Sequence, residues 1–162
     1  MMKKNGIRLY NVMFPVWLLI WFPSWLWLLL IPGNYLIDRL VLRWSLSGSE
    51  ERDRFCRRHC WKICLAGFFA DFVGSLLLFA LYCLSPTGRF GNALAFNAFA
   101  SLPAFLATVL AILLSGVLIY LLDGWILTKV GLEKERAKNA ALRLALITAP
   151  YLFLFPSALL YR

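Results

Sequence analysis

Residues 61–84 read WKICLAGFFADFVGSLLLFALYCL, a run of 24 residues in which only Lys62 and Asp71 are charged. A helix needs about 20 apolar residues, at 1.5 Å each, to cross roughly 30 Å of hydrocarbon. In that medium no water satisfies open backbone groups, so a spanning segment must be helical. The sequence therefore predicts a transmembrane helix over residues 61–84.

Three further apolar runs lie at 11–32, 101–122 and 140–161. The last two have the length and composition of transmembrane helices. Overall, 62% of residues are hydrophobic, 15% are charged and the mean hydropathy is +0.74, whereas soluble domains average about 45–50% apolar and about 25% charged residues. This composition excludes a soluble globular protein and a disordered chain. It predicts an all-α integral membrane protein.

The run at 11–32 differs from the others because it contains Pro15, Pro23 and Pro32. Each proline removes a backbone donor and clashes with the preceding helical turn. Two arms of about ten residues result, each only ~15 Å long. The run therefore fits either a Pro-broken re-entrant hairpin or a fourth, kinked span.

Basic residues are concentrated in the first ten residues and in the linkers around 39–62 and 129–143, while the linker between the second and third runs carries only Arg89. Cytoplasmic loops carry such an excess, so we expect both basic linkers in the cytosol. A re-entrant hairpin places the N-terminus there too. Residues 33–60 are expected to form a cytosolic segment with an amphipathic surface helix at 35–46. The net charge of +9 predicts contact with anionic lipid headgroups and not with nucleic acid.

Asp71 lies near the middle of its run, where a carboxylate costs about 2.5–3.5 kcal/mol to insert and is a functional candidate by default. The alternative is a structural polar contact between helices. Small residues at 66, 70 and 74 allow another helix to approach closely. If the neighbouring spans are antiparallel, several oxygen-bearing side chains lie at the same depth. The predicted ligand-binding cluster is Asp71, Ser75, Ser115, Thr148 and Tyr151.

These oxygen atoms, with a backbone carbonyl freed by Pro150, suit a proton, a hard cation or a protonated amine. The sequence thus predicts a transporter or channel subunit with Asp71 at the membrane midplane. The alternative is a non-catalytic accessory or immunity-type protein that binds another membrane protein. Because three spans enclose little volume, we expect a homo-oligomer or a membrane partner subunit. No catalytic motif is present, and we expect no enzyme activity and no cofactor.

A second group of residues has the spacing of metal ligands on one helix face: Cys56, His59, Cys60 and Cys64. Structural zinc takes four ligands in recognised orders, and Arg57 and Arg58 oppose a divalent cation, so no metal site is predicted. Palmitoylation of the juxtamembrane cysteines and simple packing remain alternatives. Asp123 is expected to pair with Lys129 or Arg143.

Several segments together resemble small multi-span membrane proteins of clostridial bacteria that have no assigned function. They are IRLYNVMFP at 7–15, Phe22-Pro23, residues 32–38, ADFVG at 70–74 and TAPYLF at 148–153. The resemblance implies a multi-pass protein of a bacterial cytoplasmic membrane. It implies no substrate, cofactor or catalytic residue.

Overall fold

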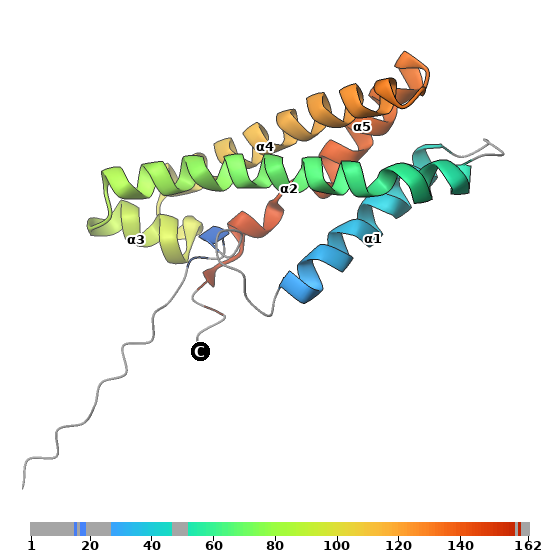
Figure 1. Ribbon diagram of the computed structural model, residues 1–162. Helices are drawn as coiled ribbons and strands as arrows, with labels where there is room; N and C mark the ends of the chain where they lie inside the picture. The colour runs from blue at the N-terminus through green and yellow to red at the C-terminus, as the bar shows by residue number, and fades with distance from the viewer. Residues whose placement is uncertain (1–14, 16, 19–26, 47–51, 158, 160–162) are drawn as a thin grey trace, which may run out of the picture.

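The computed structural model describes residues 15, 17, 18, 27–46, 52–157 and 159, whose regular structure is all helical (Figure 1). The predicted all-helical class is therefore confirmed. The elements are α1 (Trp27–Ser45), α2 (Arg52–Leu84), α3 (Gly88–Phe96), η2 (Ala98–Ala100), α4 (Leu102–Lys129), α5 (Lys134–Thr148) and η3 (Tyr151–Leu154). Within the described ranges, α2 and α4 are the two helices long and apolar enough to cross a membrane.

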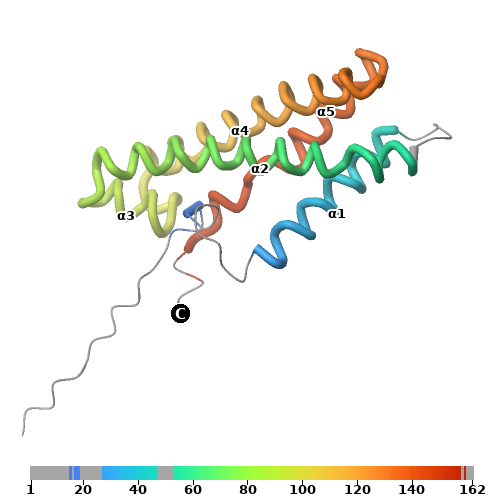
Figure 2. The backbone as a smooth tube through the Cα atoms, in the orientation of Figure 1, coloured from blue at the N-terminus to red at the C-terminus, as the bar shows by residue number. Residues whose placement is uncertain are grey.

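Helices α2 and α4 form the centre of the fold and run antiparallel, as expected from their short α3 connection (Figure 2). They meet at the stripe of small residues. A Cβ atom at Gly74 would touch Ser115 and lie 3.1 Å from the Ala111 carbonyl oxygen. The Ser115 hydroxyl donates a hydrogen bond to the Ala70 carbonyl at 3.0 Å. The close helix approach predicted for this stripe is confirmed.

Helix α5 returns along α4 after a turn at Gly131, whose φ of 95° suits glycine. It ends at Thr148, and the 3-10 turn η3 follows, so residues 140–161 do not form the single transmembrane helix that we predicted. The physical reason is Pro150, which has no N–H and forces the preceding residue out of the helical region. Ala149 accordingly has an extended ψ of 148°.

Helix α1 packs against α2 and α5. It begins at Trp27 and continues through Pro32, so the predicted boundary between residues 32 and 33 is not a helix boundary. Pro32 stands inside the helix, where its missing N–H removes the bond to the Leu28 carbonyl without ending α1. The predicted amphipathic helix at 35–46 is thus the second half of a longer helix.

The predicted boundary at residue 60 is also absent, because α2 is continuous from Arg52 through the whole 61–84 run. The N-terminal half of this helix pairs with α1 in antiparallel register. Trp27 stacks on Phe68 with ring centroids 6.1 Å apart, and Arg43 pairs with Asp53 at 3.0 Å. The predicted hairpin or kinked span at 11–32 lies outside the described residues, apart from residues 15, 17, 18 and 27–32.

The two basic linkers lie at the same end of the molecule. In Figure 1 the C-terminal end of α1, the N-terminal end of α2 and the α4–α5 connection all lie at the right, and α3 is at the opposite end. The basic residues near the first end are Arg43, Arg54, Arg57, Arg58, Lys129, Lys134, Arg136 and Lys138. The α3 end carries Arg89. The molecule is therefore electrostatically asymmetric along its long axis.

Candidate functional site

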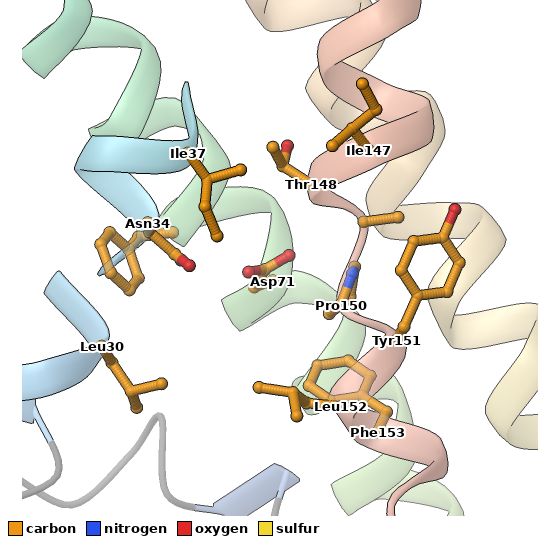
Figure 3. A pocket seen from close by; sticks show the side chains of 12 residues that line it. Leu30, Asn34, Ile37, Asp71, Ile147, Thr148, Pro150, Tyr151, Leu152 and Phe153 are labelled. Atoms are coloured by element: carbon orange, nitrogen blue, oxygen red, sulfur yellow. The ribbon is translucent and has the colours of Figure 1, made fainter. Parts of the chain in front are cut away.

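A cavity of about 260 Å³ lies between α1, the middle of α2 and the junction of α5 with η3 (Figure 3). Its lining is mainly apolar. The lining residues are Leu30, Asn34, Ile37, Phe68, Asp71, Ile147, Thr148, Ala149, Pro150, Tyr151, Leu152 and Phe153. The break after α5 contributes Ala149, Pro150 and the first residues of η3 to this lining.

Asp71 projects from α2 into the cavity, and the Asn34 side chain of α1 points toward it (Figure 3). The Asp71 side chain is only 8% exposed, and its Oδ1 atom has no hydrogen-bond partner. Buried polar atoms in folded proteins are nearly always hydrogen-bonded, so an exception calls for an explanation. Because Asp71 lines the cavity, a donor bound there could hydrogen-bond to this carboxyl.

Thr148 and Tyr151 also line the cavity, but their hydroxyl protons are already used. The Thr148 hydroxyl donates to the Leu144 carbonyl at 2.9 Å. The Tyr151 hydroxyl donates to the Leu146 carbonyl at 2.6 Å and points away from Asp71 (Figure 3). Since Pro150 offers no N–H to the Leu146 carbonyl, Tyr151 takes the place of that missing donor. Its role at this position is to cap the broken helix.

The other two predicted ligands do not line the cavity. Ser115 is fully buried between α4 and α2 and is bonded to the Ala70 carbonyl. Ser75 is fully buried and donates to the Phe72 carbonyl of its own helix at 2.8 Å. The structure therefore brings Asp71, Thr148 and Tyr151 together at one cavity and places both serines elsewhere in the helix packing.

Sequence reasoning missed the contribution of α1. Asn34, Asp38 and Leu42 recur every four residues and share one helix face. Asp38 and Leu42 are buried, and Asn34 lines the cavity. An amphipathic helix on a membrane surface would expose its polar residues to water. Asn34 and Asp38 instead share a face with apolar Leu42, next to Val41, and this mixture could have indicated that the face is directed inward.

Asp38 is the second buried acid of this region. The Cys64 thiol on α2 donates a hydrogen bond to its carboxyl, which also interacts electrostatically with the carboxyls of Asp71 and Asp123. Burial raises the pKa of Asp38 from 3.8 to about 7, and the hydrogen bond from Cys64 opposes that rise. Three helices thus each place one aspartate in the interior.

Asp123 is 1% exposed, and its Oδ1 has no hydrogen-bond partner. The predicted pairing with Lys129 or Arg143 is wrong. The Lys129 ammonium lies over the Trp125 ring at 5.5 Å, and the Arg143 guanidinium lies over the Trp44 ring at 4.6 Å. Both cations stay near the surface on aromatic faces, while Asp123 faces inward from α4 and does not line the cavity.

The cysteines of α2 contribute to packing. Cys56 and Cys60 are fully buried, and the Cys60 thiol donates to the Tyr35 carbonyl of α1 at 3.7 Å. Cys64 is also buried, as a free thiol. In the part of the chain that the structure describes, no three His, Cys, Asp or Glu side chains are grouped closely enough to hold a metal ion.

The chain matches no family model, and no curated protein or solved structure is significantly similar to it. The resemblance to small clostridial membrane proteins stays a prediction.

Proposed function

We propose that this chain is a multi-pass protein of a bacterial cytoplasmic membrane. The support is an inverted distribution of polarity. The outer face of α4 carries a stripe of apolar side chains that are each 56–60% exposed: Leu106, Leu110, Leu113, Val117 and Leu121. Soluble monomers rarely expose contiguous apolar patches of this size. The interior instead holds Asp71, Asp123, Ser75, Ser115 and Thr108.

Helix lengths and charge agree with this proposal. The candidate spans Asp53–Leu84 and Leu102–Lys129, with 32 and 28 residues, are roughly 48 and 42 Å long, more than the ~30 Å of a hydrocarbon core. The basic end would lie in the cytosol under the positive-inside bias. Because so few spans enclose little volume, a homo-oligomer or a partner subunit would complete the walls around the site.

Within that membrane, we propose that the chain binds and moves a cation at Asp71. The observation that carries this proposal is the unpartnered Oδ1 of a carboxyl that is 8% exposed and lines a cavity. Ionisable residues inside membranes usually mark ion or substrate pathways. Asp71 is the one charged side chain among the cavity-lining residues, so nothing basic competes with an arriving cation.

The test is uptake of a cation panel into liposomes that contain the purified chain or its Asp71→Asn variant. Asparagine keeps the shape of the side chain and removes the charge, so we expect uptake to fall at least tenfold. Asp123→Asn is the matched control, because it neutralises a buried acid of the same bundle that does not line the cavity. Equal uptake by wild type and Asp71→Asn would remove this residue from the mechanism. A chain that shows no uptake of any cation but co-purifies with one fixed membrane protein would favour the accessory role.

A further inference from the structure

The Asp71 cavity provides few oxygen ligands. Asp71 supplies two carboxyl oxygens, Asn34 one amide oxygen and Thr148 one hydroxyl oxygen, while the Tyr151 hydroxyl is directed away. Calcium takes six to eight oxygen ligands, and magnesium demands an octahedral set and keeps several waters. Apart from Tyr151, the other side chains of the lining are apolar and offer no hydrogen-bonding groups to the water shell that a metal ion retains.

The same cavity matches an organic ammonium ion. Its N–H groups could donate to the Asp71 carboxyl and to the Asn34 amide oxygen, whose side chains point toward each other across the space (Figure 3). Its carbon body would contact the apolar lining, which includes the aromatic rings of Phe68 and Phe153. Aromatic rings also attract cations through their π faces. Each chemical part of such a ligand therefore has a counterpart in the lining.

The C-terminal end of α5 adds negative electrostatic potential to the cavity. The last four carbonyls of a helix lack intrahelical partners, and the helix dipole makes this end favourable for cations. Ile147 and Thr148, the last residues of α5, line the cavity. The Tyr151 N–H does not return to the Ile147 carbonyl, because it bonds to the Ala149 carbonyl at 2.7 Å. The negative end of α5 thus borders the same space as Asp71.

We propose that the cavity binds a small primary or secondary ammonium ion with an apolar body, in preference to a metal ion. This inference rests on the proposed cation site and specifies the chemical class of its ligand. The volume of about 260 Å³ corresponds to roughly nine water molecules at ~30 Å³ each. It therefore limits the ligand to an amine with a short chain or a single ring.

The experiment compares ligands that differ only in their head group. Thermal unfolding of the full chain in detergent is titrated with benzylammonium, benzyl alcohol and benzoate, and separately with Na⁺, Mg²⁺ and Ca²⁺. A ligand that binds only the folded state raises the unfolding temperature. For the wild type, we expect benzylammonium to raise the unfolding temperature at concentrations at least tenfold lower than benzyl alcohol or benzoate.

Substitutions test whether the binding of benzylammonium depends on the residues of the Asp71 cavity. We expect the apparent affinity for benzylammonium to fall at least tenfold in Asp71→Asn and several-fold in Asn34→Ala, and to change less than twofold in the Asp123→Asn control. If Asp71→Asn does not fold, the head-group comparison on the wild type and the Asn34→Ala variant still decide. Equal binding of benzyl alcohol would overturn the inference.

The outcomes also separate this inference from the function on which it rests. Asp71-dependent binding of an inorganic cation without binding of benzylammonium would overturn the ligand class and leave the cation site in place. Absence of Asp71-dependent binding for every cation in the panel, together with unchanged liposome uptake in Asp71→Asn, would overturn both.

Discussion

The Ser115 hydroxyl on α4 donates a hydrogen bond to the Ala70 carbonyl on α2, 3.0 Å away and one residue before Asp71. This bond fixes the rotation of α2 against α4. Since Asp71 follows Ala70 by 100° around the helix, the same contact helps to hold the Asp71 carboxyl toward α1 and α5 rather than toward α4.

Replacing Ser115 with alanine removes this contact without adding volume. A buried hydrogen bond contributes about 0.5–1.5 kcal/mol net, and interhelical bonds in membranes average about 0.6. We expect Ser115→Ala to lower the free energy of unfolding by about 1 kcal/mol in a detergent-solubilised chain. Thr128→Ala is the control, because the exposed Thr128 hydroxyl bonds only to the Gly124 carbonyl of its own helix. A Ser115→Ala variant as stable as the wild type would contradict this account of the helix contact.

The two glycines of α2 make a matched pair. A Cβ atom at Gly74 would press on Ser115, Ala111 and Phe153, whereas a Cβ at Gly67 would meet nothing within 4 Å. We expect Gly74→Ala to destabilise the fold by about 1–3 kcal/mol through overpacking. Gly67→Ala should instead stabilise it by roughly 0.5–1 kcal/mol, because alanine is the better helix former. Chemical unfolding of the two variants measures both, and equal effects would contradict the close α2–α4 approach.

The sequence predicted helices over the 61–84 and 101–122 runs, which lie in α2 and α4, because length and apolar content indicate a helix strongly. It also predicted that Asp71 and Thr148 lie at the same level of the bundle, since residue number along a helix gives height at 1.5 Å per residue. It did not predict how each helix is rotated about its own axis. Ser75 and Ser115 share the depth of Asp71 yet lie outside its cavity, because rotation depends on contacts such as that between Ser115 and Ala70.

The sequence pattern also did not predict which of two prolines ends its helix. Pro150 ends α5, while Pro32 is accommodated inside α1. Pro32 removes one backbone bond, to the Leu28 carbonyl, and α1 continues, whereas Ala149 before Pro150 is extended. Asn34 went unnoticed since its helix was assigned to the membrane surface, where a polar side chain needs no partner.

The buried carboxyl of Asp38 gives a pH dependence whose sign follows from its environment. Burial raises the pKa of Asp38 from 3.8 to about 7, so the folded state favours the neutral acid. The stabilising contribution is complete below pH 4 and is lost as the pH rises toward 7. We expect Asp38→Asn to gain stability relative to the wild type between about pH 4 and pH 7. Parallel unfolding-temperature profiles over this pH range would contradict the burial of the Asp38 charge.

Substitution of Tyr151 tests whether its hydroxyl caps α5 or binds the ligand. Its hydroxyl bonds to the Leu146 carbonyl and points away from Asp71. We expect Tyr151→Phe to lose less than about 1 kcal/mol of stability, because this bond is exposed to its surroundings. Benzylammonium affinity should change less than twofold. A tenfold loss of affinity with unchanged stability would show that the hydroxyl contacts the ligand.

The central claim is that the Asp71 carboxyl is open to a cationic ligand inside the fold. The most direct test is modification of the chain in membranes by a hydrophobic carbodiimide, with the labelled residue found by mass spectrometry. Asp71 should be labelled, and benzylammonium should protect it in a concentration-dependent manner while benzyl alcohol does not. No protection of Asp71, or equal protection of Asp71 and Asp123, would contradict the claim.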